Sequence, residues 1–183
     1  MRTLLKKARE DVLERGIAVP DDIPLGAMIE VPSAAMTADL LAPEVDFLAL
    51  GTNDLIQYAL AVDRSNETVS DLFRPSHPEV LRLVARVAEA ALAANKPLSV
   101  CGEMAADPAL ILFFLGLGIR EFSMGPRAVP ELKEFVRSVS TRDAVRVARA
   151  ALSLSTADEV SSFLAQELRN LTESGTPSPA VRA

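Results

Sequence analysis

The sequence predicts an α/β fold in which helices cover a parallel β-sheet, and three observations predict it. Short apolar runs alternate four times with segments in which apolar residues have a helical spacing. Parallel strands need a crossover connection such as a helix, so this alternation favours parallel pairing. The runs are almost continuously apolar, and we therefore expect both faces of the sheet to be buried. Polar residues follow the runs, where parallel α/β folds gather their binding groups.

The expected elements follow one another along the chain with clear punctuation. An amphipathic helix over residues 2–15 comes first, and Gly16 can end it. Its mixture of charged and apolar residues is unlike a secretory signal. The expected strands cover residues 25–31, 45–50, 98–101 and 119–124. The helices expected among them cover residues 33–42, 55–62, about 78–94 and 107–116.

Three further helices are expected after the fourth strand. Ser140 or Thr141 can cap one of them, and Thr156 with Glu159 three residues later predicts a capping box for the last. The chain shows no repeat at a fixed period and no internal linker. We therefore expect one domain, or one piece of a domain, over residues 1–171 and a flexible tail over residues 172–183.

Composition excludes several classes of protein. Of 183 residues 49% are apolar and 24% are charged, which excludes a disordered chain. The net charge of −6 argues against binding nucleic acid through general electrostatics. No apolar run reaches the roughly 18 residues that span a membrane. The single cysteine cannot form an internal disulfide, which favours a cytoplasmic location.

The polar residues that follow the four strands predict a binding site at the carboxyl edge of the sheet. These residues are Glu30, Asn53 with Asp54, Cys101 with Glu103, and Ser123. Because the carboxyl ends of parallel strands meet at one edge, four successive strands would place these groups together.

Glu30 and Asp54 are candidate metal ligands. One strand apart, they can each give a hard oxygen ligand to Mg²⁺. Such an ion usually completes its coordination with phosphate or carboxylate oxygens of a substrate, and Asn53 can donate an amide hydrogen bond to that substrate. Each residue also has a simpler interpretation. Glu30 can be a strand-end carboxylate exposed at the rim, and the Asn-Asp pair is ordinary turn chemistry.

Cys101 and Arg64 are candidate functional residues with structural alternatives. A lone cysteine in an apolar strand is either a small buried hydrophobe or, at a catalytic edge, a proton donor or nucleophile. Arg64 either pairs with Asp63 or Glu67 at the surface or clamps a phosphate. His77, before Pro78 at a helix start, favours a capping role over a catalytic one.

The motifs resemble Enzyme I of the sugar phosphotransferase system, the phosphoenolpyruvate–protein phosphotransferase family, in its C-terminal part. The resemblance is carried by "MIEVPSAAM", "FLALGTNDLIQYALAVDRSNE", "VCGEMAADP" and "IREFSMGPRAVPELK", and extends from about Gly26 to about Leu168. Pyruvate phosphate dikinases and phosphoenolpyruvate synthases share the Glu, Asn-Asp and Cys-Gly elements. The continuation "TNDLIQYALAVDRSNE" favours Enzyme I, and a fragment of the other two enzymes is the alternative.

The resemblance implies a fold and a role for each candidate residue. The fold is the second half, about four βα units, of a TIM (β/α)₈ barrel that binds phosphoenolpyruvate. Glu30 and Asp54 are the implied Mg²⁺ ligands, and Asn53, Asp54 and Arg64 are the implied substrate contacts. Cys101 is the implied acid that protonates the enolate carbon as pyruvate forms.

The resemblance also implies partners. In the family the phosphoryl group passes to a histidine on a separate swivelling domain and then to a small phosphocarrier protein. That domain is missing here, as is the first half of the barrel with its other substrate-binding arginines. His77 lies in a different motif and is not that histidine. The chain is then a fragment, one half of a split enzyme, or a half-barrel module that binds a ligand or dimerises without turnover. A homodimer is expected because the family's C-terminal domain dimerises.

Overall fold

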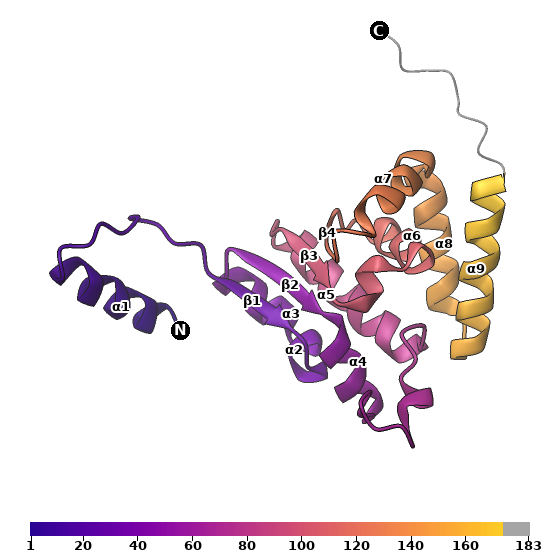
Figure 1. Ribbon diagram of the computed structural model, residues 1–183, viewed down its shortest axis with the longest axis horizontal. Coiled ribbons are helices and arrows are strands. Elements are labelled where there is room, and N and C mark those ends of the chain that lie inside the picture. Colours follow the sequence, from indigo (N-terminus) through magenta and orange to yellow (C-terminus); the bar gives the residue numbers. More distant parts are fainter. Residues whose placement is uncertain (174–183) are drawn as a thin grey trace, which may run out of the picture.

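The computed structural model of the chain describes residues 1–173, and its centre is a four-stranded parallel sheet (Figure 1). The strands lie side by side in chain order, which confirms the predicted α/β class. They are β1 (Gly26–Ile29), β2 (Phe47–Gly51), β3 (Leu98–Cys101) and β4 (Glu121–Ser123). β3 has the expected bounds, β2 begins two residues later and ends one residue later than expected, and β1 and β4 are each three residues shorter because the sheet pairs only the middle of those two apolar runs.

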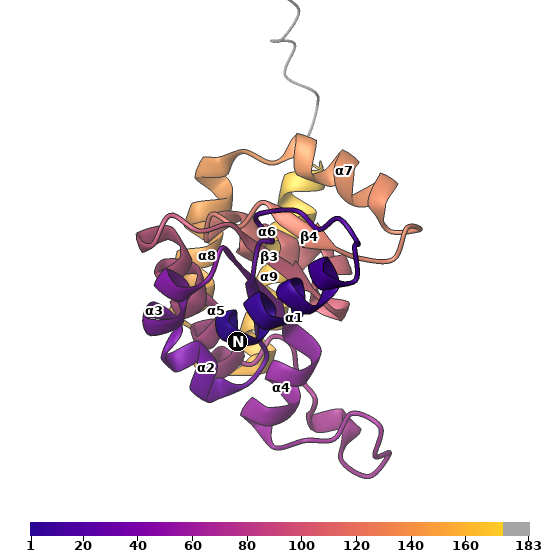
Figure 2. The same cartoon turned by 90° about the vertical axis from the view of Figure 1, so that its left-hand side faces the viewer.

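The helices connect and flank the strands. They are α1 (Arg2–Glu14), α2 (Pro32–Met36), α3 (Ala38–Leu41), α4 (Thr52–Leu60), α5 (Pro78–Ala93), α6 (Pro108–Gly116), α7 (Val129–Ser138), α8 (Thr141–Ser153) and α9 (Ala157–Glu173). Short 3₁₀ helices are η1 (Ala42–Glu44), η2 (Ser70–Leu72) and η3 (Glu103–Ala106). Helices α4 and α7 lie on opposite sides of the sheet's strands in both views (Figure 2).

Residues 1–173 cover only one face of the sheet, so the expectation that they bury both faces is wrong. The row Ile29–Leu50–Val100 is in register and fully buried against the core side chains of α5 and α6. The opposite face carries Met28, which is 49% exposed, and Phe47, which is 40% exposed. Successive strand residues point to opposite faces, so an apolar run alone does not tell which face a helix covers.

Helix α1 stands apart from the sheet at one end of the molecule (Figure 1). Within the described chain none of its residues is buried, and Leu4 is 64% exposed. Its contact with the rest is polar: the Arg2 guanidinium donates to the carbonyl of Glu44 at 2.9 and 3.1 Å. Within residues 1–173 the apolar side chains of this helix therefore take no part in the hydrophobic core.

Two helices differ from their expected bounds, and the second difference changes where site residues lie. The helix expected over 33–42 breaks at Thr37, where φ is −111° and ψ is 22°, and the Thr37 hydroxyl donates to the carbonyl of Ser33. Helix α4 begins at Thr52, three residues earlier than expected. Asn53 and Asp54 therefore lie in its first turn and not in a loop before it.

The predicted caps are confirmed. The Ser140 hydroxyl accepts from the amide of Asp143 at 3.1 Å at the start of α8. Thr156 and Glu159 form the reciprocal capping box, with hydrogen bonds of 3.2 and 3.0 Å. The imidazole of His77 accepts from the amide of Glu79 at the start of α5, a capping role.

The end of the chain differs slightly from its expected boundary. Helix α9 continues to Glu173, so residues 172 and 173 are helical, and the rest of the predicted tail lies outside the described residues. Across the described helices, none combines the length and the apolar character needed to cross a membrane.

Candidate functional site

Apart from Arg64, which lies in the loop after α4, the predicted site residues lie at the carboxyl ends of the strands. Glu30 comes directly after β1, Asn53 and Asp54 open α4 directly after β2, and Cys101 is the last residue of β3. Cys101 is in register with Gly51 on one side and Ser123 on the other. Because alternate residues share a face, Cys101 lies on the uncovered face of the sheet.

Glu30 lies against Gly51 on this uncovered face. A Cβ at position 51 would lie 2.9 Å from Glu30 Cβ and 2.9 Å from Glu30 Oε2. The glycine therefore makes room for the glutamate side chain. Glu30 is half-buried and forms no hydrogen bond or ion pair with any other residue in the range 1–173. A half-buried carboxylate without a cation is costly, which suits a site that receives one.

The thiol of Cys101 is affected by the negative charge of this carboxylate without forming a hydrogen bond to it. The Cys101 thiol donates to the carbonyl of Leu50 at 3.2 Å and lies 3.9 Å from the sulfur of Met28. Burial raises the pKa of the Cys101 thiol, and the negative charge of Glu30 raises it further. The thiol therefore keeps its proton at neutral pH, which is the state a proton donor needs.

Thr52 connects β3 to the start of α4. Its hydroxyl donates to the carbonyl of Cys101 at 2.7 Å, and it is the one fully buried polar side chain among residues 1–173. Gly102 follows with a φ of +101°, and a Cβ there would lie 2.4 Å from the Thr52 hydroxyl oxygen. Glycine is required at 102 both for the backbone angle and for this close approach.

Asn53 and Arg64 are brought together through Glu103. The amide oxygen of Asn53 accepts from the backbone N–H of Glu103 at 3.0 Å. The carboxylate of Glu103 forms an ion pair with Arg64, with 3.0 Å between Oε1 and Nη1. Arg64 forms no ion pair with Asp63 or Glu67, the two partners considered for a surface role, although its charge helps to lower the pKa of Asp63.

Asp54 is exposed in the first turn of α4 and forms no ion pair or hydrogen bond with another described residue. Nowhere in residues 1–173 do three histidine, cysteine or carboxylate side chains converge as a metal-binding group. The donor set still fits Mg²⁺, because that ion takes one or two carboxylates and completes its coordination with water and substrate oxygens. Glu30 and Asp54 would be those two carboxylates.

Two residues of this arrangement were not predicted as site residues. Glu103 was placed at the edge without a role, and Thr52 was not singled out. The local sequence offers a weak signal for Thr52, a small hydroxyl residue between a buried strand and a polar helix start. Its burial and its partner depend on a strand that is 49 residues away along the chain.

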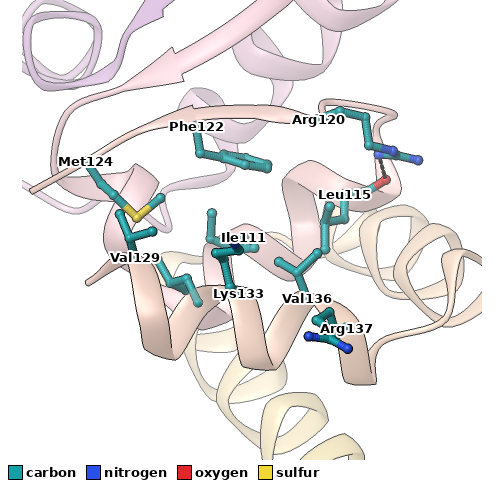
Figure 3. Close-up of a pocket in the computed structure, with 10 residues that line it drawn as sticks. Ile111, Leu115, Arg120, Phe122, Met124, Val129, Lys133, Val136 and Arg137 are labelled. Atoms are coloured by element: carbon teal, nitrogen blue, oxygen red, sulfur yellow. Dashed lines mark hydrogen bonds between the residues drawn. The ribbon is translucent and has the colours of Figure 1, made fainter. Parts of the chain in front are cut away.

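A separate cavity lies on the covered face of β4 (Figure 3). It has a volume of about 360 Å³, is open to solvent, and is lined by residues of β4, α6 and α7. Its lining is mainly apolar, including Ile111, Leu115, Phe122 and Val136, with Lys133 among them. No predicted site residue lines it in the described chain, so it is distinct from the carboxyl-edge site.

Comparisons with known proteins point to one family. Residues 1–141 match the family described as "PEP-utilising enzyme, PEP-binding domain". A phosphoenolpyruvate-protein phosphotransferase of Geobacillus stearothermophilus is 44% identical over 163 residues, which cover 89% of this chain and 28% of that protein. The enzyme of the same name from Bacillus subtilis is 42% identical over 168 residues, covering 92% and 30%. The chain thus spans less than a third of the length of these curated relatives.

A solved structure with a related arrangement is a citrate lyase of Burkholderia xenovorans. It has a TM-score of 0.48 and 18% sequence identity, and the match covers 94% of this chain and 59% of that one.

Proposed function

The chain belongs to the family of PEP-utilising enzymes through their PEP-binding domain, and we propose that its carboxyl-edge site binds phosphoenolpyruvate with Mg²⁺. In this proposal the chain is the C-terminal part of a phosphoenolpyruvate–protein phosphotransferase, Enzyme I of the sugar phosphotransferase system. The observation that carries it is the meeting of three kinds of group at one edge. Unpaired carboxylates, the oriented amide of Asn53 and a protonated thiol lie at the ends of β1, β2 and β3.

The anion-binding groups are Asn53 and Arg64. The amide oxygen of Asn53 is engaged by Glu103, so its NH₂ group is left to donate to a phosphate oxygen. Arg64 uses one N–H on Glu103 and has four more for a phosphate. Glu30 and Asp54 would hold Mg²⁺, which neutralises the charge of the substrate phosphate and carboxylate.

Cys101 acts as the general acid of the second half of the reaction. Loss of the phosphoryl group from phosphoenolpyruvate leaves the enolate of pyruvate. The proton of the Cys101 thiol then moves to the enolate carbon, which forms the C–H bond of the methyl group and leaves a thiolate. Its raised pKa supports this role, because the thiol is protonated when the enolate forms.

The uncovered face of the sheet supports a partner. Strands β1 and β4 are the outer strands of the sheet, and Met28 and Phe47 are exposed on its open face. Exposed sheet edges and apolar surface invite pairing. We propose that the preceding half of a (β/α)₈ barrel covers this face. We also propose that a histidine on a separate domain accepts the phosphoryl group and passes it to the phosphocarrier protein in the cytoplasm.

A second candidate rests on the same exposed face. Two copies of the chain can cover each other's open sheets, which would make it a dimerising or ligand-binding module without turnover. Light scattering at several concentrations tests the module, because it requires a dimer or a larger species. A well-folded monomer across that range contradicts it.

Ligand-induced stabilisation tests the binding site. Addition of millimolar phosphoenolpyruvate and Mg²⁺ is expected to raise the melting temperature of the chain, since a ligand that binds only the folded state stabilises it. Asp54→Ala should remove the rise, while Asp11→Ala, an exposed carboxylate on the remote α1, should keep it. An unchanged melting temperature of the unmodified chain would contradict the proposal.

A further inference from the structure

Glu103 touches both of the residues proposed to bind the substrate phosphate. Its backbone N–H donates to the amide oxygen of Asn53 at 3.0 Å, and its carboxylate pairs with Arg64 at 3.0 Å. The three residues come from different parts of the chain: α4, the loop after it, and the start of η3 beyond β3. One residue thus links two donors that are 11 positions apart along the chain.

The ion pair between Glu103 and Arg64 contributes little to folding. The two side chains are 72% and 45% exposed, and exposed pairs of this kind stabilise proteins by only about 0–1 kcal/mol. Its effect is instead geometric. The guanidinium group is a rigid fork, and a carboxylate held on one nitrogen sets the direction in which the remaining N–H groups point.

The backbone of Glu103 has a matching effect on Asn53. An amide side chain can present either its oxygen or its NH₂ group, and the two ends differ only in hydrogen-bonding character. The N–H of Glu103 requires the oxygen of Asn53 and so turns the NH₂ group the other way. Gly102, pressed against Thr52 and Asn53, keeps the backbone of residue 103 in this place.

We propose that Glu103 is a positioning residue that presents the Asn53 amide and the Arg64 guanidinium to an anionic ligand. This inference rests on the proposed binding of phosphoenolpyruvate for the identity of the ligand, but the ordering of Arg64 does not depend on it. In this role Glu103 acts through Asn53 and Arg64 and transfers no proton.

Two substitutions separate the two contacts of Glu103. Glu103→Ala removes the carboxylate and keeps the backbone N–H. Glu103→Pro removes both, and proline is tolerated at the first position of a helical turn, where Glu103 stands in η3. Asp39→Ala is the matched control, because it breaks another exposed pair, with Arg86 at 3.5 Å, away from the site.

The first measurement needs no ligand. NMR relaxation of the Arg64 Nε–H group should report an ordered side chain in the unmodified protein, and Glu103→Ala should make it as mobile as Arg15. Arg15 serves as the mobile reference because it has no side-chain partner among the described residues. The inference is wrong if Arg64 is already mobile in the unmodified protein, or if it stays ordered in Glu103→Ala.

The second measurement is calorimetric titration with phosphoenolpyruvate and Mg²⁺. We expect Glu103→Ala to weaken binding by about tenfold, as when a charged hydrogen-bonding group loses its alignment, and Glu103→Pro to weaken it further. Asp39→Ala should bind as the unmodified protein does. Equal or tighter binding by Glu103→Ala overturns the inference and shows the carboxylate to be a competitor of the anion. If the unmodified protein does not bind, the proposed function fails, and the NMR measurement still decides the role of Glu103.

Discussion

The hydroxyl of Thr52 donates a 2.7 Å hydrogen bond to the carbonyl of Cys101, so the first residue of α4 is tied to the last residue of β3. The Thr52 side chain is fully buried and Cys101 is partly buried, and the bond lies between the residues proposed to bind phosphate and the residue proposed to donate a proton. This hydrogen bond therefore fixes the start of α4, which carries Asn53, relative to Cys101.

Removing this hydroxyl should destabilise the protein. Thr52→Val keeps the shape of the side chain but leaves the partly buried Cys101 carbonyl without this donor, which costs about 1–3 kcal/mol of the free energy of unfolding. Urea denaturation measures the loss. Thr37→Val is the matched control, because the Thr37 hydroxyl also bonds a carbonyl, at 2.8 Å, but at an exposed position. Equal losses in both variants would contradict a special role of Thr52.

Gly102 is expected to tolerate no side chain. Gly102→Ala places a Cβ 2.4 Å from the Thr52 oxygen and forces alanine into a φ of +101°. Gly118→Ala gives the reference, since its φ is +88° but no described atom lies within 4 Å of the added Cβ. We expect about 1–2 kcal/mol of destabilisation from the backbone angle in both variants and about 1–3 kcal/mol more at 102 from the clash. Equal melting temperatures of the two variants would show that the close approach at 102 costs nothing.

Cys101 should react slowly with iodoacetamide at neutral pH. Burial and the charge of Glu30 raise the pKa of its thiol, and only the thiolate reacts. The alkylation rate should rise with pH around a midpoint above the ordinary value of about 8.5. Glu30→Gln should move this midpoint to lower pH. Glu121→Gln, a second carboxylate on β4 that does not contribute to the shift, should leave it in place.

The same pKa predicts how stability depends on pH. A thiol whose pKa is higher in the folded state binds its proton more tightly there than in the unfolded chain. Its contribution to the free energy of unfolding is complete below the unfolded pKa and falls as the pH rises through the folded pKa. Urea denaturation at neutral and alkaline pH should show this loss, and Cys101→Ala should remove the part that the thiol causes.

Gly51→Ala should weaken ligand binding more than folding. Gly51 has a φ of −84°, which alanine adopts without strain, but its Cβ would lie 2.9 Å from Glu30 Cβ. Glu30 must then move, at a cost of about 1–3 kcal/mol in overpacking. The rise in melting temperature with phosphoenolpyruvate and Mg²⁺ should shrink or vanish. Gly125→Ala, where the added Cβ meets no described atom within 4 Å, should keep it.

Several features could be predicted because their signals are local. The apolar runs around Leu50 and Val100 gave the strands and their parallel order, and Thr156 with Glu159 gave a cap that the structure confirms. These signals act over a few residues, through backbone hydrogen bonds and helix ends. The bounds of α4 were missed because Thr52 and Asn53 favour turns as readily as helix starts.

The sequence by itself determined which elements form, their order, and which polar residues follow the strands at one edge. Only the tertiary structure decided that the described residues leave one face of the sheet uncovered, that Thr52 binds Cys101, and that Glu103 joins Asn53 to Arg64. The reason is physical. Element type depends on residues a few positions apart, whereas these contacts join residues 39 to 50 positions apart and exist only when the strands pair in register.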